Sequence, residues 1–101
     1  MNNVTRADVE ALRRAARRIA SISEEYRDEY TAMYRVIHEK LKAAWMGDDS
    51  DSFQENVDSI KYKFTNMYDI MNSYVQFLLD TASKYEEQIR MMEEAANQIQ
   101  F

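Results

Sequence analysis

The sequence contains no proline, no cysteine and only one glycine, Gly47. Proteins built on sheets or on alternating strands and helices need turn residues at regular spacing, so this composition argues against both classes. Without cysteine, the chain has no disulfide framework and no thiolate metal site. The 101 residues are 46% hydrophobic and 31% charged, which is typical of one small folded domain.

Long apolar runs are also missing. The longest run has four residues, 43–46, and is far too short to span a bilayer. The first six residues contain no apolar segment of the kind found in a general secretory signal. We therefore expect no direct membrane insertion, and any export would proceed without a cleaved signal peptide.

The net charge of −5 makes nucleic acid an unexpected partner. The charge is unevenly distributed, because residues 1–47 carry +2 and residues 48–101 carry −7. A mildly basic half and an acidic half indicate two elements that lie against each other.

The first half has the hydrophobic period of a helix, from about residue 5 to residue 45. Thr5 and Asp8 have the three-residue spacing of a capping box, with Asp in place of the usual Glu. Apolar residues then recur every seven positions, with others three or four residues away. The repeat comprises Leu12, Ile19, Tyr26 and Met33.

The second half, about 53–97, has the stronger pattern. Hydrophobic residues recur at alternating steps of four and three, and this sustained period of 3.5 residues predicts a helix with a coiled-coil-like seam. The series runs through Phe53, Val57, Ile60, Phe64, Met67, Met71, Tyr74 and Leu78, and it continues through Thr81, Tyr85, Gln88, Met92, Ala95 and Ile99.

Residues 45–52 form the predicted turn between the helices. Gly47 suits the left-handed conformation of a helix C-cap, and Ser50, Asp51 and Ser52 suit the start of the next helix. A connection this short favours antiparallel neighbours. The fold prediction is therefore one all-α domain over residues 1–101, an antiparallel two-helix hairpin. Folding at the turn places Arg13 and its neighbouring arginines near Glu86 and Glu87.

Two helices are too thin to enclose a core, and apolar residues remain outside the predicted seam. We therefore predict that the hairpin pairs into a four-helix bundle dimer. The predicted hairpin seam consists of Leu12, Ile19, Met33, Phe53, Val57, Ile60, Phe64, Met67, Met71 and Leu78. The predicted partner interface consists of Tyr34, Tyr62, Ile70 and Phe77.

The tripeptide Trp45-Met46-Gly47 lies between two amphipathic helices of similar length. In this position it resembles the turn of the WXG family, the early-secreted-antigen-like small proteins of type VII secretion systems. The resemblance implies dimerisation with a second copy, with a related protein or with the helical N-terminal domain of a larger toxin. It also implies export in the folded state by a secretion ATPase, a cytoplasmic stage before export, and an association with virulence.

One position departs from the family pattern. Family substrates carry a tyrosine followed four residues later by an acidic residue, whereas Tyr85 is followed at that spacing by Ile89. Tyr85 is therefore either a degenerate export signal or a seam residue. The departure favours a heterodimer whose partner carries the signal. It leaves open a cytoplasmic adaptor or targeting chaperone for a secreted toxin, and an unrelated coiled-coil structural module.

No residue pattern indicates catalysis, a cofactor or a metal. His38 is the only histidine and has no catalytic context. The aspartates at 48, 49 and 51 lack the glycine and distal glutamate of an EF-hand, so helix capping is the favoured interpretation. Trp45 either covers the end of the bundle or forms part of a recognition surface.

Overall fold

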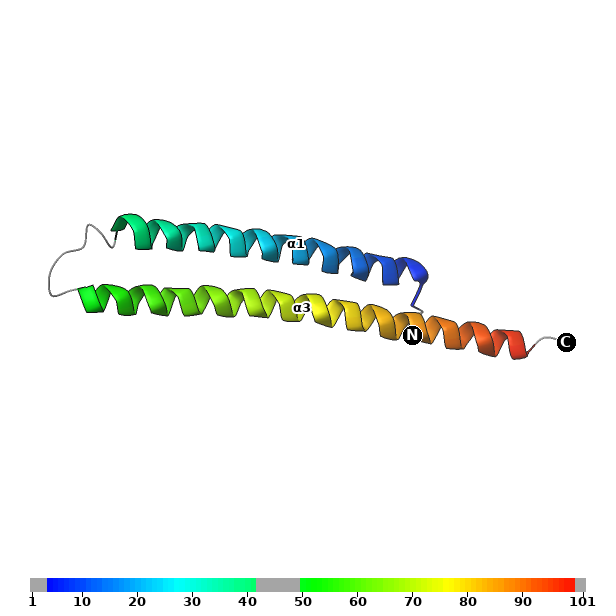
Figure 1. Ribbon diagram of the computed structural model, residues 1–101. Coiled ribbons are helices and arrows are strands. Elements are labelled where there is room, and N and C mark those ends of the chain that lie inside the picture. Colours follow the sequence, from blue (N-terminus) through cyan, green and yellow to red (C-terminus); the bar gives the residue numbers. More distant parts are fainter. Residues whose placement is uncertain (1–3, 42–49, 100–101) are drawn as a thin grey trace.

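The computed structural model describes residues 4–41 and 50–99. Helix α1 spans Arg6–Val36, a π-helical turn η1 spans Ile37–Leu41, and helix α3 spans Ser50–Gln98. The two long helices run antiparallel and side by side (Figure 1), in a molecule of 86 × 18 × 17 Å. The described residues include no strand. The predicted all-α hairpin is confirmed.

Helix α1 begins with the predicted capping box. The Thr5 hydroxyl accepts a hydrogen bond from the Asp8 backbone N–H at 3.2 Å, and the Asp8 carboxylate accepts one from the Thr5 N–H at 2.8 Å. Two backbone N–H groups at the helix start are thereby satisfied, and the carboxylate lies at the positive end of the helix dipole.

The helix boundaries differ from the predicted ones. The first helix leaves regular α geometry at Val36, where the Ile37 N–H is shared between the carbonyls of Met33 and Tyr34. A π-helical turn then continues the chain to residue 41. The second helix begins at Ser50, inside the predicted turn of 45–52, and ends one residue beyond the predicted 97. The tripeptide Trp45-Met46-Gly47 lies outside the described residues.

Small side chains bring the helices together along the N-terminal part of α1. Val9, Ala16 and Ser23 recur every seven residues, and all three are buried. Val9 forms a core cluster with Ala82 and Ile89 of α3. Partly buried hydrophobic side chains pack around this cluster, namely Val4, Leu12 and Tyr85.

A polar pair lies in the middle of the seam. The Ser23 hydroxyl is fully buried and donates a hydrogen bond of 3.1 Å to the Asn72 side-chain oxygen. A buried hydroxyl is costly without such a partner, and a shift of either helix by one turn would separate the pair. The contact therefore favours this one register of α1 against α3.

Aromatic side chains fill the seam toward the turn. The ring of Phe64 lies 5.7 Å from that of Tyr26, 5.8 Å from that of Tyr30 and 6.4 Å from that of Tyr34, measured between centroids. Tyr26 and Tyr30 also meet edge to face at 5.5 Å. These separations are typical of favourable aromatic pairs, so Phe64 anchors α3 against three successive turns of α1.

Ion pairs at the edge of the seam agree with the predicted antiparallel register. Arg13 contacts Glu86 at 2.9 Å, and Arg6 contacts Glu93 at 2.6 Å. The hydrogen bond from Arg13 lowers the pKa of the Glu86 carboxyl below its ordinary value. Glu87 instead pairs with Arg90 of its own helix. These exposed pairs add little stability individually, but they disfavour wrong registers.

We expect Phe64→Ala to destabilise the fold by about 3–5 kcal/mol, because it removes the ring that three tyrosines surround. Tyr62→Ala is the matched control, since Tyr62 is 72% exposed and its loss should change stability by less than about 0.5 kcal/mol. Urea unfolding followed by circular dichroism measures both. Equal midpoints for the two variants would contradict the aromatic anchor.

Candidate functional site

Helix α3 has a hydrophobic surface that α1 covers only in part. One edge of it packs in the seam and is buried or half-buried; its members are Phe64, Tyr68, Met71, Val75, Leu78, Ala82, Tyr85 and Ile89. The other edge remains in solvent, with exposures of 41% to 62%; its members are Ile60, Met67, Ile70, Tyr74 and Phe77. Both edges repeat at three- and four-residue steps, which is the spacing of a helix-packing stripe.

Helix α1 adds hydrophobic residues on the same side of the hairpin. Ile22 directly precedes the buried Ser23, just as Ile70 directly precedes the half-buried Met71. When two helices run antiparallel, the residues that directly precede a seam residue in each helix point to the same side of the pair. We call the resulting surface the apolar face. It comprises Ile22, Met33 and Val36 of α1 together with Ile60, Met67, Ile70, Tyr74 and Phe77 of α3.

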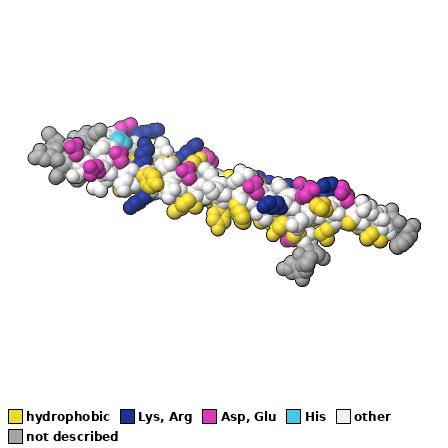
Figure 2. Space-filling model, turned by 90° about the horizontal axis from the view of Figure 1, so that it is seen from below, with side chains coloured by type: hydrophobic (Ala, Val, Ile, Leu, Met, Phe, Trp, Pro, Cys, Tyr) yellow, Lys and Arg dark blue, Asp and Glu magenta, His cyan; other side chains and the backbone are white. Residues whose placement is uncertain are grey.

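The space-filling view shows how hydrophobic side chains are distributed along α3. They gather along one long edge of the molecule, the lower edge in Figure 2, while charged side chains are frequent along the opposite edge. Exposed hydrophobic residues that are contiguous in this way mark an interaction surface more often than scattered ones do.

The α3 part of the apolar face contains a shallow hollow of about 350 Å³, lined by Ile70, Ser73, Tyr74 and Phe77. The Tyr74 and Phe77 rings meet edge to face with centroids 6.4 Å apart. Aromatic side chains around a surface hollow are typical of positions that contribute strongly to binding between proteins. This arrangement can accept an apolar side chain from another helix.

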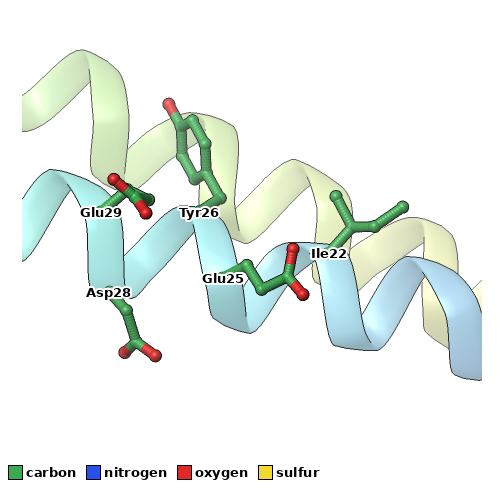
Figure 3. Close-up of a pocket in the computed structure, with 5 residues that line it drawn as sticks. All are labelled: Ile22, Glu25, Tyr26, Asp28 and Glu29. Carbon is green, nitrogen blue, oxygen red and sulfur yellow. The ribbon is translucent and has the colours of Figure 1, made fainter.

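A second hollow of about 400 Å³ lies on α1 beside Ile22 and Tyr26 (Figure 3). The Tyr26 ring packs toward α3, whereas the Asp28 carboxylate points away from it. Glu25 and Glu29 complete the lining. Across residues 4–41 and 50–99, no group of three histidine, aspartate or glutamate side chains is placed to hold a metal ion. The carboxylates form an acidic border to the apolar face.

The predicted seam residues divide between the two surfaces. Val57 is buried, and six others are half-buried in the hairpin, namely Leu12, Ile19, Phe53, Phe64, Met71 and Leu78. Met33, Ile60 and Met67 are exposed instead and lie on the apolar face. The predicted 3.5-residue series draws its members alternately from the two edges of the α3 hydrophobic surface. One member packs in the seam and the next lies on the exposed edge. Tyr74, placed in that series, is exposed for the same reason.

The predicted partner residues also divide. Ile70 and Phe77 lie on the apolar face. Tyr34 differs from the prediction because it is only 7% exposed and packs against Phe64 within the hairpin. Tyr62 is exposed but lies two residues from Ile60, which places it on another side of the helix. Two residues of the apolar face, Ile22 and Val36, belonged to neither the predicted seam nor the predicted interface. Their signal was a helical spacing from Met33, with Val36 three residues after it and Ile22 eleven residues before it.

The region of the degenerate export signal lies in the hairpin core. Ile89 is 8% exposed within the cluster of Val9 and Ala82, and Tyr85 packs against that cluster. This packing supports the interpretation of Tyr85 as a seam residue and not the interpretation as a degenerate export signal.

A comparison with known protein families identifies the family to which this hairpin belongs. The family described as proteins of 100 residues with WXG matches residues 5–88. The chain belongs to this family. Its members are small proteins associated with type VII secretion.

Among the curated proteins and the solved structures, no match was found. In the described part of this WXG-family chain, neither helix is apolar enough over a sufficient length to cross a membrane. The family assignment and the apolar face are therefore the two observations on which a functional proposal can be based.

Tyr34 offers a test of the seam. Its hydroxyl is buried without a hydrogen-bond partner among the described residues, and burial raises the pKa of this phenol. We expect Tyr34→Phe to be at least as stable as the wild type, because it removes an unsatisfied polar group. Tyr34→Ala should cost about 3 kcal/mol through lost packing. A Tyr34→Phe variant that melts well below the wild type would show that the hydroxyl has a partner.

Proposed function

We propose that this protein is a type VII secretion substrate or partner subunit that acts through helix–helix association, with no catalytic activity of its own. The observation that carries the proposal is the apolar face, a row of exposed hydrophobic side chains along one side of a WXG-family hairpin. The partner is a second hairpin or helical domain, which would complete a four-helix bundle.

The dimensions of the hairpin support this proposal. The molecule is only 18 and 17 Å across in its two short directions, so neither direction has room for more than two helices. In the described part of the chain, the buried hydrophobic residues are Val9, Ala16, Tyr34, Val57, Ala82 and Ile89. So small a core gives marginal stability, and covering the apolar face would add the hydrophobic burial that the hairpin lacks.

The proposed route is export without a cleaved signal peptide, after a cytoplasmic stage in which a secretion ATPase engages the assembled bundle. A second candidate function is a targeting adaptor that brings a larger secreted toxin to the machine. The position of Ile89 favours this candidate, because the residue four after Tyr85 is buried and hydrophobic where family substrates carry an acidic one. Blotting of culture supernatants separates a substrate from an adaptor that stays in the cell.

We expect Phe77→Asp to abolish association and to leave the helical circular dichroism spectrum intact. Phe77 is 62% exposed in the isolated hairpin, so the hairpin itself loses little, whereas a carboxylate inside an apolar interface is strongly disfavoured. Tyr62→Asp is the matched control, since it places the same charge away from the apolar face. Light scattering after size exclusion gives the masses against the 12.0 kDa chain.

The proposal fails if Phe77→Asp and Tyr62→Asp associate as the wild type does, because the apolar face would then not be the contact. In the producing cells, the same pair of variants should differ in secretion or in the secretion of the partner. Equal secretion would show that association through this face is not needed for transport.

A further inference from the structure

We infer that α1 carries a second binding surface on its outer side, at Arg14, Arg17 and Arg18, which binds a short carboxylate-rich segment of another protein. The inference goes beyond the proposed function, because this surface is separate from the hydrophobic contact that the proposed function uses. The three arginines lie in the N-terminal half of α1, the blue part of that helix in Figure 1. All three are exposed, and none of them takes part in an ion pair within the described residues.

The helical spacing directs these side chains away from α3. Arg14 and Arg18 lie two residues to either side of Ala16, which is 1% exposed in the seam. Two residues turn a helix by about 200°, so both arginines point to the side opposite the seam. Arg17 follows Arg14 by three residues and adjoins the same surface. Small exposed residues lie beside the three arginines and leave the guanidinium groups accessible, namely Ala11, Ala15 and Ser21.

The hairpin itself does not neutralise this cluster. Arg13, the fourth arginine of the same stretch, contacts Glu86 at 2.9 Å and Glu10 at 3.6 Å. No acidic residue occurs between Glu10 and Glu24. Arginines three and four residues apart on one helix repel each other, and this repulsion destabilises the helix when nothing is bound. Ion pairs within the hairpin therefore do not account for the cluster, whereas an anion from outside would relieve the repulsion.

Carboxylates at both ends of the cluster limit the length of the ligand. Glu10 lies seven residues before Arg17, and therefore on the same edge of the helix. Glu25 lies seven residues after Arg18 in the same way, and the Asp28 carboxylate also points away from α3 (Figure 3). Glu10 and Glu25 are fifteen residues apart, or about 22 Å of helix. A membrane or a nucleic acid lying along α1 would bring phosphates against these carboxylates, whereas a short acidic segment fits between them.

The use of arginine in place of lysine favours carboxylates as the ligand. Residues 1–39 contain seven arginines and no lysine, while all five lysines lie after residue 39. A guanidinium group is a planar fork that binds a carboxylate through two parallel hydrogen bonds, which an ammonium group cannot form. Arginine is also enriched at protein interfaces, where lysine is depleted. Together with the limit on length, this composition favours a protein segment in which several carboxylates lie close together.

The arginine surface and the apolar face can be occupied at the same time. Ile22 is the residue of the apolar face nearest to the arginines along the chain, and it follows Arg17 by five residues. Five residues turn the helix by about 140°, so the two side chains point in different directions. Arg18, four residues before Ile22, lies at the border between the two surfaces. A partner on the apolar face therefore leaves Arg14 and Arg17 in solvent.

Fluorescence anisotropy with a short labelled oligoglutamate peptide tests this surface in the full-length chain. The arginine variant carries Arg14→Gln, Arg17→Gln and Arg18→Gln. It should bind the peptide at least about tenfold more weakly than the wild type at low ionic strength, where charge attraction is least screened. The lysine variant is the matched control, and it removes the same charge from exposed positions of α3 that have no ion pair within the described residues, through Lys61→Gln, Lys63→Gln and Lys84→Gln. It should bind as the wild type does.

Two further readouts separate a binding role of the arginines from a structural one. Replacing the same three arginines with lysine keeps the charge but removes the planar forks, so this variant should also bind the peptide several-fold more weakly. The thermal midpoint of the arginine variant, followed by circular dichroism, should equal or exceed that of the wild type, because repulsion within α1 is removed. A midpoint well below the wild type would assign the arginines to the fold and contradict the inference.

Binding that only the two sets of arginine substitutions weaken supports the inference. The inference is overturned if the wild type does not bind the peptide at millimolar concentration, if the lysine variant loses as much affinity, or if phosphatidylglycerol vesicles or single-stranded DNA bind the arginines more tightly than the peptide does. Phe77→Asp should lose association with the hairpin partner and keep peptide binding. If Phe77→Asp associates normally while the peptide still binds at the arginines, the proposed function fails and this inference stands. If the arginine variant loses the association instead, this inference fails.

Discussion

The hydrophobic surface of α3 is wider than one neighbouring helix can cover, and the organisation of the molecule follows from this. Phe64, Met71 and Leu78 pack toward α1 along one edge of that surface, while Met67, Tyr74 and their neighbours remain in solvent along the other. A helix that is apolar over so broad an arc needs two neighbours to bury it. The hairpin supplies one neighbour from within the chain, and in the proposed function a partner supplies the second.

The seam with α1 is therefore only half of the packing, and it differs along its length. Near the chain ends, the buried seam residues are the small or medium-sized Val9, Ala16 and Ala82. Toward the turn, Phe64 packs against three tyrosines. Between these parts, the Ser23–Asn72 hydrogen bond replaces an apolar contact with a polar one. A buried polar pair of this kind adds less stability than hydrophobic packing, and its contribution is to specify the register. The register in turn decides which residues of α1 stand beside which residues of α3 on the apolar face.

Much of the fold could be predicted from the sequence because local and global signals agree in it. The absence of proline, the 3.5-residue period and the Thr5–Asp8 spacing each predict helix, and the structure has helices and the capping box there. The family was also found from the sequence, since the Trp-x-Gly tripeptide stands between two amphipathic segments. The contact between Arg13 and Glu86 follows from the antiparallel register alone. These features depend on spacing along the chain, which the sequence shows directly.

The rotation of each helix about its own axis could not be predicted in the same way. Ile60 and Met67 belong to a period of 3.5 residues whether they face α1 or a partner, because both edges of the α3 surface have that period. Tyr34 is equally suited to an interface and to a core, and only its packing against Phe64 shows that it is buried. The residues that would have shown the rotation are small. The buried positions Ala16, Ser23 and Ala82 mark the seam, and a search for large hydrophobic residues does not find them.

The position of Ile89 links the packing to the question of how the protein is recognised for transport. This side chain is 8% exposed between Val9 and Ala82, so a carboxylate there would be buried without a cation in the core cluster. Arg6, which lines a small hollow together with Ile89, is already paired with Glu93, and Arg13 is paired with Glu86. An acidic residue four positions after Tyr85 would therefore weaken the packing of α1 against α3 that is seen here. In this chain the hairpin seam extends through the region where family substrates carry their signal, so the proposed function requires that recognition for transport depend on another part of the molecule.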